Sequence, residues 1–156
     1  METVIAFFKP AERYEGVRPF HIWGLRALYL LAFAFVGTWA WSSLLKHEGP
    51  WEQYRSVAIC VWAAYPTLFA IGVFKPLRML PLMLFMIVYK SLWLGLVAYP
   101  MYQAGTLTPP MIAMAKDFMV LPLGLIVVPW GYVFRTYFGF PGQWAPGRAA
   151  PAPALD

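Results

Sequence analysis

Apolar positions along the chain gather into long runs that are separated by short segments of charged residues, proline and glycine. The four runs cover about residues 23–45, 56–74, 79–101 and 118–138. Because an α-helix rises 1.5 Å per residue, each run is close to the roughly 20 residues that cross the hydrocarbon core of a bilayer. The runs are too long and too uniformly apolar for barrel strands. The pattern predicts an all-α integral membrane protein with four transmembrane helices in an antiparallel bundle.

The segments between the runs predict how the helices follow one another. The connection "KPLR" at 75–78 is so short that the second and third helices must form an antiparallel hairpin. Thr108 followed by Pro109 is a good N-cap and first-turn pair, so the fourth helix is expected to start before its apolar run. We expect residues 1–22 to form a cytoplasmic or interfacial segment and the Pro- and Ala-rich residues 139–156 to form a disordered cytoplasmic tail.

Composition agrees with a membrane location. The 156 residues are 61% hydrophobic and 12% charged, against roughly 25% charged residues in soluble domains. With 156 residues there is no room for a separate soluble catalytic domain beside four spans. We expect a multi-pass protein of the cell membrane, taken as the bacterial inner membrane, with membrane lipids around it.

The net charge of +5 is interpreted as a topology signal, because the basic residues are dispersed and form no nucleic-acid-binding domain. Short loops rich in Lys and Arg remain in the cytoplasm. Most basic residues lie on the side of the two termini, so both termini are expected to be cytoplasmic. The residues on that side are Lys9, Arg13, Arg18, Arg26, Lys75, Arg78, Arg135 and Arg148, against Lys46, Arg55 and Lys116 on the other.

The sequence offers little for catalysis. All Asp and Glu residues lie in predicted loops or termini, and His21 and His47 flank the first span about a membrane thickness apart. Phosphate-binding loops, nucleophilic triads and metal-hydrolase motifs are missing from the sequence. We therefore expect no catalytic residues, no metal and no cofactor, and a protein that is not an enzyme.

Lys90 is the one charged residue at the centre of a predicted span, where a lysine costs about 2.5–3.5 kcal/mol on the insertion scale. Its side chain cannot reach water at either end of the span, so it must be accommodated inside. We consider three fates: donation to groups within the bundle, pairing with a carboxylate of another subunit or an anionic lipid head, and a role in an ion path or catalysis.

The candidate contact residues are expected at a depth in the membrane similar to that of Lys90. Pro66 and Pro129 each free a helical carbonyl, which could accept from Lys90. The set of expected ligand or partner contacts is Lys90, Tyr65, Trp62, Trp93, Ser91, Pro66 and Pro129.

The favoured function is association: an accessory subunit of a membrane complex, or a binder of a hydrophobic small molecule or lipid. The first alternative is an oligomeric transporter or channel that uses Lys90 in an anion path. The second is a lipid- or quinone-linked membrane enzyme. Another membrane subunit or a second copy of the chain is the expected protein partner, and no nucleic acid is expected.

Overall fold

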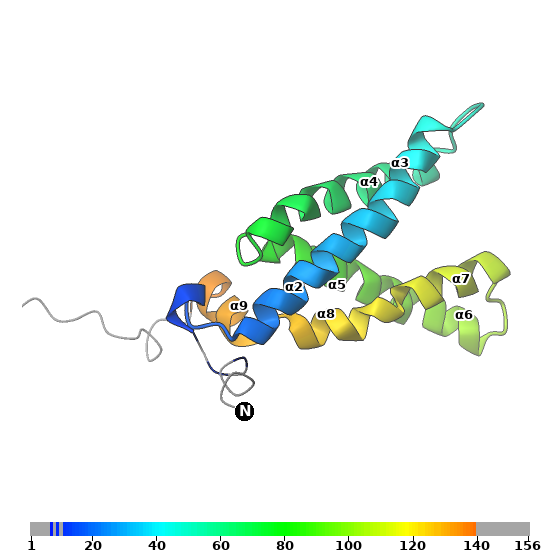
Figure 1. The fold of residues 1–156 in the computed structure, drawn as a ribbon. Helices are drawn as coiled ribbons and strands as arrows, with labels where there is room; N and C mark the ends of the chain where they lie inside the picture. The colour runs from blue at the N-terminus through cyan, green and yellow to red at the C-terminus, as the bar shows by residue number, and fades with distance from the viewer. Residues whose placement is uncertain (1–6, 8, 10, 140–156) are drawn as a thin grey trace, which may run out of the picture.

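The computed structural model describes residues 7, 9 and 11–139, and within that part the regular elements are all helices (Figure 1). Four of these helical stretches are long and apolar enough to cross a membrane: Pro19–Leu45, Gln53–Phe74, Leu80–Gln103 and Pro109–Val127. The prediction of four apolar spanning helices is confirmed. The expected disordered tail lies outside the described residues, apart from Gly139.

Three of the four spans contain a change of helical geometry. The first consists of α2 (Pro19–Leu31), the π-helical η2 (Ala32–Gly37) and α3 (Thr38–Leu45). The second is the single helix α4 (Gln53–Phe74). The third consists of α5 (Leu80–Trp93), the π-helical η3 (Leu94–Ala98) and α6 (Tyr99–Gln103). The fourth consists of α7 (Pro109–Asp117), the 3₁₀ turn η4 (Phe118–Val120) and α8 (Leu121–Val127).

The fourth span differs from the expected range 118–138. Its helix begins at Pro109, directly after the N-cap residue Thr108, so the first-turn signal marks the start of the span itself. It ends at Val127 because the next residue precedes a proline and takes the extended conformation that this position favours, with ψ 125° at Val128. Pro129 therefore does not kink a continuous span, and the short helix α9 (Trp130–Tyr137) follows as a separate element.

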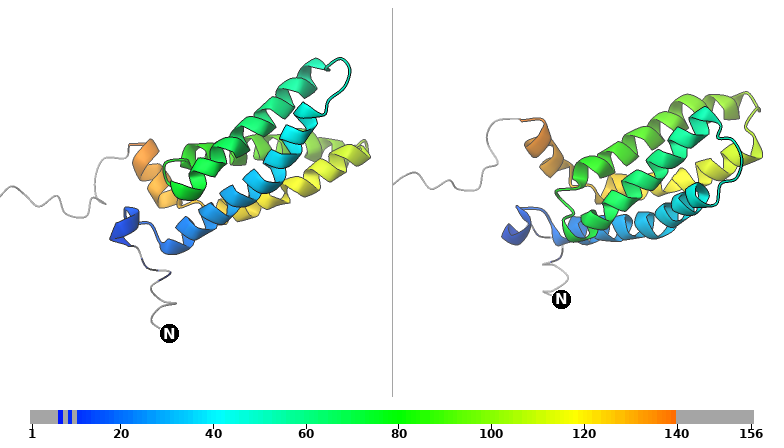
Figure 2. Two further views of the ribbon diagram at one scale, coloured as in Figure 1. Left: turned by 45° about the horizontal axis from the view of Figure 1, so that its top comes forward. Right: turned by 90° about the horizontal axis from the view of Figure 1, so that it is seen from above.

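The spans form two helical hairpins that meet at one end and diverge toward the other (Figures 1 and 2). We call the end where α2 begins and α8 stops the terminal end, and the end where α3 and α6 stop the distal end. The connection between α4 and α5 and the helix α9 also lie at the terminal end (Figure 1). The buried core includes Leu25 and Tyr29 of α2, Phe69 of α4, and Met83 of α5.

Two glycines allow α2 to approach its neighbours closely. A Cβ atom on Gly72 would lie 2.7 Å from a ring carbon of Tyr29, so α4 can pack against this ring only without a side chain there. A Cβ atom on Gly24 would lie 2.8 Å from the methyl groups of Val127, at the end of α8. His21 Nδ1 donates to the carbonyl oxygen of the same Val127 at 2.8 Å, which satisfies a carbonyl that has no further helical turn to bond.

The N-terminal segment is attached to α9 through Glu15. The hydroxyl of Tyr132 donates to Glu15 Oε2 at 2.9 Å, and Arg135 Nη2 donates to the Glu15 carbonyl oxygen at 3.0 Å. Burial and the hydrogen bond to the Glu15 carboxylate raise the pKa of the Tyr132 hydroxyl. These bonds place α9 beside the start of the chain at the terminal end (Figure 1).

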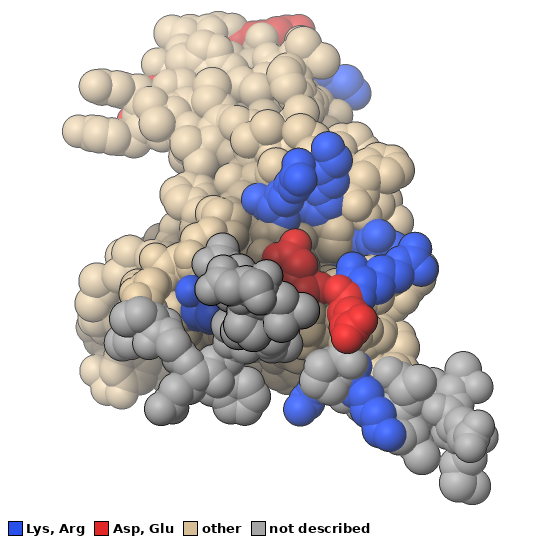
Figure 3. Space-filling view, turned by 90° about the vertical axis from the view of Figure 1, so that its left-hand side faces the viewer, with Lys and Arg blue, Asp and Glu red and all other residues tan. Residues whose placement is uncertain are grey.

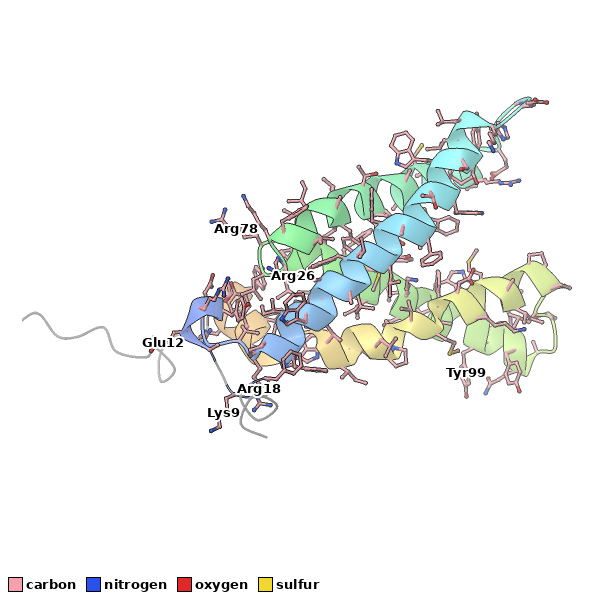
Figure 4. The ribbon with its side chains drawn as sticks, viewed as in Figure 1. Lys9, Glu12, Arg18, Arg26, Arg78 and Tyr99 are labelled. Carbon is pink, nitrogen blue, oxygen red and sulfur yellow. The ribbon has the colours of Figure 1, made fainter. Side chains whose placement is uncertain are left out.

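Lys and Arg side chains gather at the terminal end (Figure 3). Arg18, Arg26 and Arg78 lie toward this end, whereas Tyr99 lies on the distal half of the third span (Figure 4). Arg26 places its guanidinium 5.1 Å from the ring centre of Trp23, and its Nε atom is buried without a hydrogen-bond partner.

Glu52 caps the second span, and we expect its replacement by alanine to lower the melting temperature slightly at neutral pH. Its carboxylate accepts from the backbone N–H groups of Tyr54 and Arg55 at 3.0 and 2.6 Å, and these bonds hold the pKa of Glu52 below its ordinary value. A lowered carboxyl pKa stabilises the fold above the unfolded value of about 4.3 and stops doing so as the pH falls through the folded value.

Thermal unfolding of the detergent-solubilised wild type and Glu52→Ala at pH values from neutral to strongly acidic measures this contribution. The two curves should converge at the acidic end. A difference that is constant with pH would contradict the cap. Gln53→Ala is a suitable control, because the side chain of Gln53 follows the cap and makes no such bond.

Candidate functional site

A cavity of about 640 Å³ lies between the two hairpins where they diverge. Its walls come from α2, η2 and α3 on one side and from α5, α7 and η4 on the other, with part of α4. Six aromatic side chains line it: Phe35, Trp39, Trp62, Tyr65, Tyr89 and Phe118. The volume falls within the roughly 300–1,000 Å³ that is usual for small-molecule sites, and the walls are mainly apolar as in such sites.

Lys90 contributes a positive charge to this cavity. The residue is 4% exposed and is the one charged residue among the buried part of the described chain. Its Nζ atom lies 4.3 Å from the ring centre of Phe118 and 5.9 Å from that of Tyr89. No hydrogen-bond acceptor or ion-pair partner reaches the ammonium from the described residues. Its contacts are therefore with aromatic faces, which attract a cation but accept no conventional hydrogen bond.

Asp117 lines the same cavity and interacts electrostatically with Lys90. Asp117 precedes the apolar run expected from the sequence, but the apolar helical stretch that is long enough to cross a membrane starts at Pro109 and includes it. The two residues are not in direct contact, and Asp117 is exposed whereas Lys90 is buried. Sequence reasoning missed Asp117 as a site residue. The Thr108–Pro109 start signal could have revealed it, had the span been counted from there.

Two tyrosine hydroxyls form the other polar feature of the cavity. The hydroxyls of Tyr65 on α4 and Tyr89 on α5 lie 3.3 Å apart, close enough for one to donate to the other. The indole of Trp62 interacts with the Tyr89 hydroxyl, and its ring centre lies 5.7 Å from that of Trp39. The polar groups are thus carried by rings that also form the apolar wall.

The structure brings together Lys90, Tyr65 and Trp62 from the predicted contact residues and separates the rest from them. Trp93 does not line the cavity but packs on Phe118, with ring centres 5.2 Å apart. Ser91 is exposed and lies outside the cavity, since the residue next to Lys90 on a helix faces another direction.

The two prolines act on packing and helix ends in this structure. Pro66 is buried, and its Cβ lies 3.4 Å from where a side chain on Gly37 would begin, so it fits against the first span. Pro129 precedes α9, and the Leu125 carbonyl, which the proline would leave free in a continuous helix, accepts from Trp130 Nε1 at 2.8 Å. That carbonyl already has a donor, and the structure shows no bond to it from Lys90, which was one of the fates left open by the sequence.

Metal-ligating residues do not converge: nowhere in the described residues do three or more His, Cys, Asp or Glu side chains come together. His21, one of the two histidines, is bonded to Val127 at the terminal end. The cavity is thus lined mainly by aromatic and aliphatic side chains, with the ammonium of Lys90, the carboxylate of Asp117 and the hydroxyls of Tyr65 and Tyr89 as its polar groups. Comparison of the chain with protein-family models, with curated protein sequences and with solved structures found no match.

Proposed function

We propose that this protein binds a hydrophobic small molecule or lipid in the cavity between its two hairpins. The observation that carries the proposal is the cavity of about 640 Å³, which is lined by aromatic rings and lies within the spanning helices. A ligand there would replace lipid tails against Phe35 and Trp39, which are 70% and 52% exposed at its edge. Burying such aromatic surface against a ligand is favourable, and the cavity volume suits one small molecule.

The same observation supports ligand binding over the alternatives. Of the two kinds of association expected from the sequence, binding of a hydrophobic molecule is the one that an intramembrane cavity favours. An anion path between copies of the chain would need Lys90 on an outer surface, whereas Lys90 faces a cavity within one chain. The quinone- or lipid-linked enzyme would require reacting groups beyond the lysine, carboxylate and hydroxyls that line this cavity.

Filling the cavity tests the proposal. Ala113 of α7 lines the cavity and is exposed, so Ala113→Trp should occupy the space and exclude the ligand. We expect native mass spectrometry of the protein purified in mild detergent to show a bound small molecule in the wild type and a loss of at least about tenfold in Ala113→Trp, a loss equivalent to about 1.4 kcal/mol. The experiment measures the ratio of ligand-bound to free protein.

The matched control is Ala27→Trp. Ala27 is also an exposed alanine on a spanning helix, but it does not line the cavity. It should retain the bound molecule. Equal loss in both variants, or full retention in Ala113→Trp, would contradict binding in the cavity.

We also propose that the protein is inserted in the cell membrane, taken as the bacterial inner membrane, with both termini in the cytoplasm. The support is the gathering of Lys and Arg at the terminal end (Figure 3) and the rule that basic loops stay in the cytoplasm. Fluorescent and periplasmic reporter fusions in the 75–78 connection and at the C-terminus should both report cytoplasm. A fusion in the connection between α3 and α4, near Gly49, should report the opposite side. A periplasmic C-terminus would refute this orientation.

A further inference from the structure

We infer that the ligand of the cavity is a single-chain amphiphile with a terminal carboxylate, whose head group binds Lys90. This inference rests on the proposed function and names the chemical class of the ligand. It starts from a donor without an acceptor on a buried residue that lines the cavity. Lys90 as a whole is 4% exposed, and its ammonium, which has three N–H donors, meets only the aromatic faces of Phe118 and Tyr89 among the described residues.

A buried charged group is stable when it is paired and hydrogen-bonded, so this ammonium requires a partner that the described chain does not bring to it. The aromatic contacts compensate in part, since a cation near a ring gains roughly 0.5–2 kcal/mol. A carboxylate accepts only and offers about four lone-pair sites, which makes it complementary to an ammonium with free donors.

The neighbouring hydroxyls agree with this choice. Tyr65 and Tyr89 lie beside one another with oxygens 3.3 Å apart, so when one donates to the other the second hydroxyl hydrogen is free to donate onward. Lys90 and this hydroxyl pair together present more donors than acceptors to the cavity. An anionic or strongly accepting head group satisfies them, whereas an ammonium head group would add further donors.

Asp117 carries the opposing charge, and its position decides how strongly it competes with a bound carboxylate for Lys90. It lines the cavity and attracts Lys90, so it offsets part of the field that a bound carboxylate would feel. Asp117 is exposed, so its carboxylate is open to partners outside the cavity, whereas the buried Lys90 meets only what enters the cavity. The lysine therefore determines the sign of the head group, and Asp117 weakens the binding.

The rest of the cavity determines the tail. Beside the charged residues, its wall is formed by aliphatic and aromatic side chains such as Leu28, Met86 and Phe35. A single flexible alkyl chain can follow this wall and leave the cavity at the exposed Phe35 into the acyl layer. A long-chain carboxylic acid is complementary to this cavity, with its head group at the Lys90 ammonium and its tail along the apolar wall.

The test compares probes that share one tail and differ only in the head group. Oleate, oleyl alcohol and oleylamine are titrated into delipidated full-length protein in mild detergent at neutral pH, with binding followed by native mass spectrometry. We expect oleate to bind at least about tenfold more tightly than oleyl alcohol, and oleylamine to bind most weakly. Equal affinities for oleate and oleyl alcohol, or a preference for oleylamine, would overturn the inference.

Variants assign the preference to the named residues. Lys90→Met should remove the advantage of oleate over oleyl alcohol, and Asp117→Asn should increase oleate affinity several-fold. Lys116→Met is the matched control, since Lys116 is exposed on α7 and does not line the cavity, and it should behave as the wild type. An unchanged head-group preference in Lys90→Met would overturn the assignment, and the probe series on the wild type decides the head group even if a variant fails to fold.

The outcomes for the two proposals are separable. If all three probes bind equally and Ala113→Trp blocks them, the cavity binds hydrophobic chains and only the carboxylate inference is wrong. If none of the probes binds and Ala113→Trp removes no co-purified molecule, both proposals are wrong.

Discussion

Gly72→Val is expected to cause a large loss of stability. A Cβ atom at this position would lie 2.7, 2.8 and 2.9 Å from three carbons of the Tyr29 ring. The ring cannot move aside easily, because Tyr29 is fully buried, its hydroxyl donates to the Pro76 carbonyl at 3.1 Å, and Phe69 lies 4.8 Å from it between ring centres. Overpacking costs roughly 1–3 kcal/mol for small additions, and a β-branched side chain should exceed that.

The measurement is the melting temperature of the variants in detergent, with Gly72→Ala as the milder step and Gly95→Ala and Gly95→Val as controls. Gly95 also lies in a spanning helix, but a Cβ atom there would meet nothing within 4 Å. The two Gly72 variants should lose stability in order of size, and the Gly95 variants should lose little. Similar losses at both glycines would show that helix geometry, and not contact with Tyr29, is responsible.

A second substitution can show that the clash is with the ring. Tyr29→Leu removes the ring carbons that a Gly72 side chain would meet, at its own cost for an emptied core site. Gly72→Ala should therefore be less harmful in the Tyr29→Leu background than in the wild type. Strict additivity of the two changes would argue against direct contact, since residues in contact are coupled.

The number and approximate position of the spans were predictable because apolar runs of helical length have few other solutions in a membrane. The extent of the fourth span could not be predicted from its apolar run. The helix starts at Pro109, as the Thr108–Pro109 signal indicated, but the helical stretch long enough to cross a membrane ends at Val127 and includes Lys116 and Asp117. Charged residues can occupy a span when they face a cavity or reach its edge, and no hydropathy pattern reveals a cavity in advance.

The candidate site was predictable only in its centre. A lone lysine in an apolar run marks a special position, and the structure places Tyr65 and Trp62 of the neighbouring helix at the same cavity. How closely the hairpins meet depends on side-chain packing, such as that of Gly24 on α2 against Val127 on α8, which sequence spacing does not specify. The π-helical segments η2 and η3 change which residues face the cavity after them, so a regular helical period cannot assign faces across them.

Lys90→Met is expected to raise the stability of the unliganded protein by about 1–3 kcal/mol. The substitution replaces a buried ammonium without an acceptor among the described residues by an apolar side chain of similar length. Asp117 loses an electrostatic partner with which it is not in direct contact, so this loss is the smaller effect. Lys116→Met, which removes an exposed lysine outside the cavity, should change stability less than Lys90→Met does.

An excess of oleate should reverse this order of stabilities. A ligand that binds only the folded state adds about 2.7 kcal/mol at a concentration of 100 times its Kd. The wild type should receive this gain and Lys90→Met much less of it, so the two melting temperatures, measured with and without oleate in the same detergent, should cross. If Lys90→Met is less stable than the wild type without ligand, the ammonium has an acceptor within the folded protein and is a structural residue. If it is more stable under both conditions, the lysine is a cost that oleate does not offset, and its partner must be sought outside this cavity.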